Sequence, residues 1–220
     1  MSDIFREVDD DVRRDRYEKL WQQYGNFVIG AVLVLVVAAA AWQGYGYFRT
    51  KEAERAGSKF QEALESSERD RSAQAESLLA SVVKKGPPGY AMLARFREAA
   101  ETGKRDPAAG ATLYDGLAGE TALGPTLQGL TQLRAAMLLA DRLPPADLKK
   151  RLEPLAMPRS PWRNLARELL GLSELKAGEF DAAGRYFDDI VTDPEASADL
   201  RQRVEIYLGV VKAGPLPAKS

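Results

Sequence analysis

A long stretch without charge stands near the N-terminus of this sequence: no Asp, Glu, Lys or Arg occurs in the 29 positions between Lys19 and Arg49. A helix over residues 27–48 would be about 33 Å long at ~1.5 Å per residue, and the hydrocarbon core of a bilayer is about 30 Å thick. Trp and Tyr side chains lie on both sides of this segment, as they do at membrane interfaces. The pattern predicts a single transmembrane helix over residues 27–48.

Two other interpretations of the apolar segment are a buried core helix and a cleaved signal peptide. Residues 27–37 have the length of a signal peptide's apolar region, and residues 38–41 offer cleavage sites. The first 26 residues, however, carry seven acids and five bases, whereas a signal peptide begins with a short, positive region. We therefore expect a permanent anchor. Four basic residues near each end leave the orientation undecided by charge, and we expect the commoner arrangement, with a cytoplasmic tail over residues 1–26.

The composition excludes several classes of site. The chain contains neither Cys nor His, which rules out disulfides, thiol nucleophiles, His-based triads and Cys/His zinc sites. Its net charge of −1 lacks the basic excess that is typical of nucleic-acid-binding domains. No phosphate-binding loop or catalytic motif occurs, so we expect no enzyme, no cofactor and no metal. Asp188, Asp189 and Asp193 fit no calcium-loop spacing and are interpreted as a solvated helix face.

Beyond Arg49 the sequence is rich in helix-forming residues and shows no convincing alternation typical of strands. Clusters of Gly and Pro interrupt it roughly every 15 to 20 residues, which favours antiparallel helical hairpins. We predict an all-α fold with a domain over residues 49–212 and a flexible tail over residues 213–220. The predicted helix pairs are 50–67 with 71–84, 89–102 with 106–118, 125–141 with 145–155, and 161–177 with 180–192, followed by a capping helix over 195–211.

A sequence repeat accompanies these hairpins. Four small residues, separated by 34, 37 and 37 positions, are predicted to lie where two helices pack closely: Ala75, Ala109, Ala146 and Ala183. In the last copy Gly171 is the small residue of the first helix, and Phe187 is the large residue that fills the gap beside it. A two-helix repeat of about 34 residues is the tetratricopeptide period. We therefore predict an α-solenoid, and an irregular helical bundle is the alternative.

Helical repeat arrays bind partners on a concave surface. With Gly171 as the small position of its helix, the residues one turn to either side are predicted to line that surface: Glu168, Leu172, Leu175 and Lys176. Apolar surface would supply affinity there, and charge would select among partners. The alternative is that both leucines belong to the core and both charges are merely solvated.

The N-terminal Met-Ser-Asp-Ile-Phe-Arg-Glu-Val (residues 1–8), the single anchor and the first helix over residues 53–64 together resemble the YfgM-type ancillary subunits of the SecYEG translocon. The resemblance covers nearly the whole chain and involves packing positions, not a catalytic signature. It implies a bacterial inner-membrane protein whose periplasmic repeat domain associates with the translocon and with membrane-anchored periplasmic folding factors. The alternatives are a tetratricopeptide scaffold for envelope assembly or cell division, and an enzyme or small-ligand carrier built from the same helices.

Overall fold

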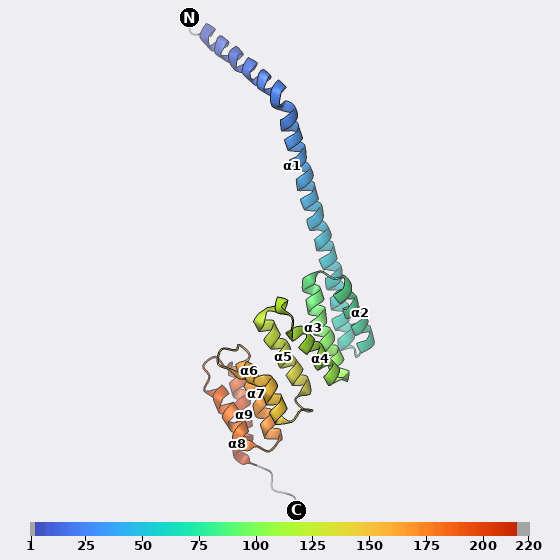
Figure 1. Cartoon of the computed structure of the whole chain (residues 1–220), viewed down its shortest axis with the longest axis vertical. Helices are drawn as coiled ribbons and strands as arrows, with labels where there is room; N and C mark the ends of the chain where they lie inside the picture. Colours follow the sequence, from blue (N-terminus) through green and yellow to red (C-terminus); the bar gives the residue numbers. More distant parts are fainter. Residues whose placement is uncertain (1–2, 215–220) are drawn as a thin grey trace, which may run out of the picture. The chain divides into compact units, whose positions relative to one another are not determined.

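The computed structural model describes residues 3–214, with every side chain from Ile29 onward (Figure 1). Residues 1–2 and 215–220, which belong to the two predicted terminal tails, lie outside the described residues. The described part consists of α-helices, one short 3-10 helix and connecting turns, and it contains no strand. This confirms the all-α prediction.

The chain divides into two compact units, Met1–Gly57 and Ser58–Ser220. The first unit consists of the greater part of helix α1 (Asp3–Glu68). Within the portion of α1 from Ile29 onward, the most apolar 18-residue window has a mean hydropathy of 1.7, and none of this window is buried. A helix of this length and apolarity is able to cross a membrane. A core helix would be mostly buried, whereas none of this window is, so the interpretation as a buried core helix is not supported.

The second unit holds the end of α1 and the remaining helices, which follow one another as hairpins (Figure 1). The capping helix starts three residues later than predicted, because the hydroxyl oxygen of Ser197 caps it by accepting the Leu200 N–H at 3.3 Å. The helices are α2 (Ser72–Lys85), α3 (Pro88–Arg105), α4 (Pro107–Ala118), α5 (Gly124–Leu139), α6 (Pro145–Ala156), α7 (Arg163–Lys176), α8 (Phe180–Val191) and α9 (Ala198–Ala213), with the 3-10 helix η1 (Thr121–Leu123) before α5.

Local signals start and end these helices. Asp106 caps α4, because its Oδ1 accepts the N–H groups of Ala108 and Ala109 at 3.0 and 3.1 Å, and Pro107 takes the first helical position. Gly178 lies in the turn after α7 with a φ of +83°, a conformation that favours glycine. Such short connections join consecutive helices as antiparallel neighbours.

The second helix of each hairpin buries the same face. In α2, α4, α6 and α8 the residues that stand 4, 8 and 11 positions after the N-cap are all buried. These positions lie on one side of a helix with 3.6 residues per turn. The residues at the first position are Ala75, Gly110, Leu148 and Ala183; at the second, Leu79, Tyr114, Leu152 and Phe187; at the third, Val82, Leu117, Leu155 and Ile190.

Two of the predicted small packing residues fall outside this register. Ala146 is exposed in the first turn of α6, and Leu148 takes the buried position in its place. Ala109 is half-buried, and the buried residue is its neighbour Gly110. A constant spacing does not predict this register, because the turns within the hairpins differ in length and the repeat has no constant period.

In the hairpin of α7 and α8, the helices pack closely at Gly171, Ala183 and Phe187, the residues predicted for this contact. Phe187 and Ala183 are fully buried, and the Phe187 ring lies 5.4 Å from the ring of Tyr207 on α9. A Cβ added at Gly171 would lie 2.5 Å from Cε1 of Phe187, much closer than van der Waals contact allows. Glycine at this position therefore lets the backbone of α7 lie directly against the Phe187 ring.

Candidate functional site

Each of the helices α3, α5, α7 and α9 carries a row of residues at positions i, i+4, i+7 and i+11, and the last position of the α5 row lies just after that helix. These positions are neighbours on one face of a helix, because each is about a whole number of turns from the next. None of the sixteen side chains is buried. We name this set the exposed stripe; it consists of Leu93, Arg97, Ala100 and Lys104; Leu130, Arg134, Met137 and Asp141; Leu165, Leu169, Leu172 and Lys176; and Asp199, Arg203, Ile206 and Val210.

The large exposed apolar side chains of the second unit are concentrated on the exposed stripe. Among its described residues, Leu113 on α4 and Met157 after α6 are the members of this class outside the stripe. Scattered apolar residues are ordinary on protein surfaces, whereas a set gathered on one face marks an interaction site. The stripe residues of this class, with exposed fractions from 37% to 65%, are Leu93, Met137, Leu165, Ile206 and Val210.

Two contacts connect the helices that carry the first three rows of the exposed stripe. Lys176 of α7 donates to the carboxylate of Asp141, just after α5, at 2.7 Å, so the fourth positions of these two rows touch. Between α3 and α5, Leu138 packs against Gly103, where an added Cβ would lie 2.7 Å from Cδ1 of the leucine. The α5 and α7 rows therefore meet at their fourth positions, and α3 contacts α5 beside their rows.

The structure separates the four residues predicted to bind a partner. Leu172 and Lys176 belong to the exposed stripe, whereas Glu168 and Leu175 do not. Glu168 is 9% exposed, and its carboxylate accepts two hydrogen bonds from Arg203 of α9, at 2.6 and 3.0 Å. Leu172 and Leu175 are half-buried against the core formed by α8 and α9. This corrects the prediction for Glu168, whose carboxylate joins α7 to α9 because the capping helix supplies an arginine.

The remaining members of the exposed stripe were not found from the sequence, although a signal was present. A leucine opens three of the four rows, and the same four-residue spacing recurs in each helix. The first positions are offset by 37, 35 and 34 residues (Leu93, Leu130, Leu165 and Asp199). The pattern has no fixed period, because the offset changes from one hairpin to the next.

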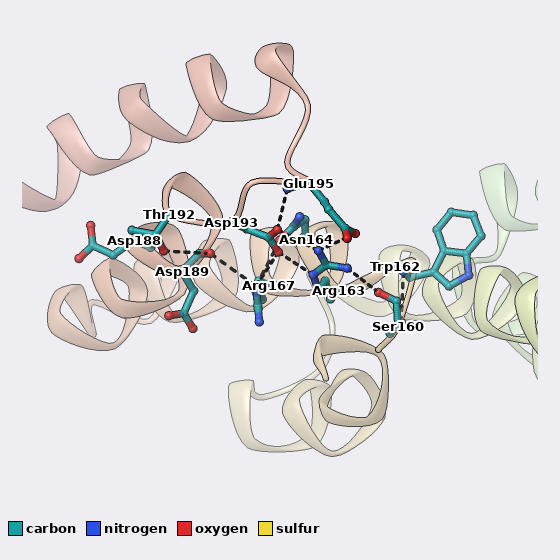
Figure 2. A network of polar contacts seen from close by, with 10 residues as sticks. All are labelled: Ser160, Trp162, Arg163, Asn164, Arg167, Asp188, Asp189, Thr192, Asp193 and Glu195. Carbon is teal, nitrogen blue, oxygen red and sulfur yellow. Dashed lines mark hydrogen bonds and ion pairs between the residues drawn. The ribbon is translucent and has the colours of Figure 1, made fainter. Parts of the chain in front are cut away.

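A polar network fixes the turn between α8 and α9 (Figure 2). The carboxylate of Asp193 accepts hydrogen bonds from Nε and Nη2 of Arg163, at 2.6 and 2.8 Å, and from the N–H of Glu195 at 2.9 Å. The Asp193 side chain is 8% exposed, so its interpretation as a solvated residue is wrong, whereas Asp188 and Asp189 are exposed. No group of three potential metal ligands occurs among the described residues. The network is an intramolecular clamp with both carboxylate oxygens occupied.

This clamp predicts how the stability of the domain depends on pH. The guanidinium of Arg163 holds the pKa of Asp193 well below its usual value. A carboxyl group with a lowered folded pKa contributes stability above its unfolded pKa, about 3.9 for Asp, and loses it as the pH falls through the folded pKa. We expect the unfolding free energy of the wild type to fall below about pH 4. Asp193→Asn should be less stable at neutral pH and should lose less stability on acidification.

Urea unfolding between neutral pH and pH 3, followed by circular dichroism, measures both curves. Asp188→Asn is the matched control, because Asp188 is an exposed carboxyl group on α8 outside the clamp. Its curve should follow that of the wild type. Parallel curves for the wild type and Asp193→Asn would contradict the role given to this carboxylate.

A second buried polar cluster joins the last turn of α1 to α3. Ser67 is 4% exposed; its hydroxyl donates to Oε1 of Glu101 at 2.6 Å and accepts from Arg97 and Lys104 at 2.7 and 2.9 Å. Burial raises the pKa of Glu101, but the hydrogen bonds from Ser67 and Lys104 and the charge of Arg97 outweigh burial and lower it. A serine beside a lysine has the composition of a nucleophile pair. This hydroxyl, however, is buried and donates to a carboxylate, so the cluster holds α1 against α3.

Comparison with known proteins identifies a family. The family model described as a tetratricopeptide repeat-like domain matches residues 18–212. The match covers most of the chain and includes the helices from α2 to α8 in full. No curated protein and no solved structure matches the sequence.

Proposed function

The chain belongs to the tetratricopeptide repeat-like family, and from this premise we propose that it is a membrane-anchored protein–protein interaction module. Repeat arrays of this type stack two-helix units and offer an extended surface to a partner. Family membership supports a protein-binding role in general. The anchor, the compartment and the class of partner are proposed from separate features of the chain.

The exposed stripe is the observation that supports this function most directly. It holds five of the seven large exposed apolar side chains in the described part of the second unit. None of the described residues of α2, α6 or α8 belongs to this class. Exposed apolar surface gathered on neighbouring helices is stabilised when a partner covers it. The charged members of the stripe provide the polar surroundings that accompany such a contact.

We propose that residues 27–48 anchor the protein in a bacterial inner membrane. The tail over residues 1–26 would lie in the cytoplasm, and the domain over residues 49–212 with its tail over 213–220 in the periplasm. The uncovered apolar helix supports the anchor. The position of this segment ahead of a large domain supports the orientation, and the resemblance to YfgM-type subunits supports the compartment.

This topology makes a direct prediction. Protease added to spheroplasts should degrade the helical domain, because the domain lies outside the intact membrane, and should spare a tag placed at residue 1. The mature protein should begin near residue 1 and should stay in the membrane during carbonate extraction. Full protection of the domain would contradict the orientation. A mature N-terminus near Trp42 would show that the apolar segment is a signal peptide.

We propose the Sec translocon and membrane-anchored periplasmic folding factors as the partners. The protein would then be an ancillary translocon subunit that links the translocon to periplasmic chaperones. The support is the resemblance of residues 1–8, the anchor and residues 53–64 to YfgM-type subunits. A scaffold for envelope assembly or cell division would use the same module with different partners.

Removing apolar surface from the exposed stripe tests the function. Replacing Leu93, Met137 and Leu165 together by serine should lower the recovery of crosslinked partners at least about tenfold, which corresponds to ~1.4 kcal/mol of binding free energy. The unfolding free energy should change by no more than about 0.5 kcal/mol per site, because these side chains are exposed. Crosslinking in intact membranes followed by quantitative mass spectrometry measures recovery and identifies the partners.

The matched control removes exposed apolar side chains outside the stripe. Leu113→Ser combined with Met157→Ser should leave partner recovery unchanged. Translocon subunits and anchored folding factors among the lost partners would support the proposed function, and division or envelope proteins would favour the scaffold. Equal recovery from the triple variant and the wild type would overturn the exposed stripe as the binding surface.

A further inference from the structure

The rows of the exposed stripe on α3 and α5 combine apolar with basic side chains. Each row begins with a leucine that is followed four residues later by an arginine: Leu93 and Arg97 on α3, and Leu130 and Arg134 on α5. Because residues four apart are neighbours on a helix surface, each arginine lies beside the apolar members of its own row. Lys104 at the end of the α3 row adds a third cation.

The carboxylates of the protein balance only part of this positive charge. Glu101 pairs with both Arg97 and Lys104, at 2.8 and 3.0 Å, so one negative charge faces two positive charges. Asp141, at the end of the α5 row, pairs with a lysine of α7. Arg134 is exposed and forms no ion pair among the described residues. Two positive charges are therefore unbalanced on this part of the surface.

Arg97 and Arg134 both lie near the core cluster that contains Tyr114. Burial raises the pKa of the Tyr114 phenol on α4, and the charges of Arg134 and Arg97 both oppose this rise. Tyr114 belongs to the core cluster that α3, α4 and α5 share. Phe96 and Ala100 of α3, on either side of Arg97, pack against the same core cluster that contains Ala135, the residue after Arg134. Both arginines therefore stand beside one core cluster, and a single bound segment could meet both.

We propose that the α3–α5 part of the exposed stripe binds polypeptide segments that carry acidic residues among apolar ones. Carboxylates of the segment pair with Arg134 and with the cation that Glu101 leaves unbalanced, while apolar side chains cover Leu93 and Met137. A guanidinium holds a carboxylate through two parallel hydrogen bonds, which basic or uncharged side chains cannot accept in the same way. This inference rests on the proposed protein-binding function and adds the chemistry of the partner.

Peptide binding to the full-length protein in nanodiscs of zwitterionic lipid tests the inference. The probes are three fluorescent peptides with the same leucines, in which the remaining positions are glutamate, lysine or serine. The leucine–glutamate peptide should bind most tightly, and its affinity should fall as added salt screens the charges. Arg134→Glu should weaken this binding at least about tenfold, and Arg134→Gln should weaken it less because it adds no repulsion.

Arg185→Glu is the matched control, because Arg185 is an exposed arginine of α8 outside the exposed stripe. This variant should bind the leucine–glutamate peptide as the wild type does. Equal affinity for the glutamate and lysine peptides, or wild-type affinity in Arg134→Glu, would overturn the inference. Two further outcomes would overturn it. If self-association of the protein through Arg134 displaces the peptide, the occupant is a second copy; if anionic lipid displaces it through Arg134, the occupant is a membrane.

The peptide assay and the partner assay separate the two proposals. If no acidic peptide binds while serine substitution of the stripe still abolishes partner recovery, the protein-binding function stands and the acidic-segment inference fails. If the serine variant recovers its partners as the wild type does, the function assigned to the stripe fails, whatever the peptides show.

Discussion

Gly110→Ala is expected to lower the unfolding free energy of the helical domain by about 3 kcal/mol, at the upper end of the usual cost of overpacking. A Cβ at Gly110 would lie 2.5 Å from Cα of Gly103, 2.7 Å from its backbone nitrogen and 2.9 Å from the carbonyl oxygen of Ala99. All three are backbone atoms of α3 and cannot turn aside as the end of a side chain can. Helix α4 must therefore move away from α3 along their whole contact. For a domain of this size such a loss lowers the melting temperature by roughly 6–12 °C.

The same substitution elsewhere on α4 provides the control. Gly116 has no atom within 4 Å of an added Cβ. Gly116→Ala should therefore stabilise the domain by about 0.5–1 kcal/mol, because alanine loses less backbone entropy than glycine in a helix. Thermal and urea unfolding of both variants measure the difference. Equal midpoints would show that α3 and α4 do not touch at Gly110.

Gly171→Leu is expected to have the second largest effect, a loss of about 2–3 kcal/mol of unfolding free energy through overpacking. An added Cβ would lie 2.5 Å from Cε1 of Phe187 and 2.9 Å from Cδ1 and Cζ. The Phe187 ring is fully buried and packs against Tyr207, so it cannot yield without displacing α9. The rest of the leucine side chain enlarges the clash.

Two further variants identify the cause of this loss. Gly209→Leu, on the exposed side of α9 where an added Cβ meets no atom within 4 Å, should raise the midpoint slightly, because leucine is a better helix former than glycine. Phe187→Leu should cost stability in the wild type but restore part of it in the Gly171→Leu background, because the smaller side chain relieves the clash. Additive effects of the two substitutions would mean that Gly171 and Phe187 do not form the tight crossing.

The helices could be predicted from the sequence because their signals are local. The Gly and Pro clusters placed the helix predicted over residues 161–177 within two residues of α7 at each end. The buried residues of the second helices could not be predicted from a constant repeat spacing alone. Leu148 takes the position expected for Ala146, because the position of the N-cap of each second helix fixes which residues are buried. The turns before these helices differ in length, so the N-caps are not evenly spaced.

The candidate site could be predicted only in part. Leu172 and Lys176 follow from helical spacing beside Gly171, and both belong to the exposed stripe. Glu168 forms an ion pair with Arg203, which is 35 residues away in the sequence, so no local pattern indicates this contact. Met137 could not be predicted in the same way, because α5 has no glycine at the position equivalent to Gly171. Without this glycine, the sequence does not indicate which face of α5 points outward.

Site-specific photo-crosslinking in intact cells tests most directly whether the exposed stripe of an anchored domain contacts protein partners. Met137 on the stripe and Leu113 on α4 are similarly exposed, at 48% and 42%, and each can carry a photoreactive residue. We expect Met137 to yield discrete adducts with a translocon subunit or an anchored folding factor, identified by mass spectrometry, and Leu113 to yield none of these. Adducts with the same partners from Leu113 alone, or equally from both positions, would contradict the assignment of the exposed stripe as the binding surface.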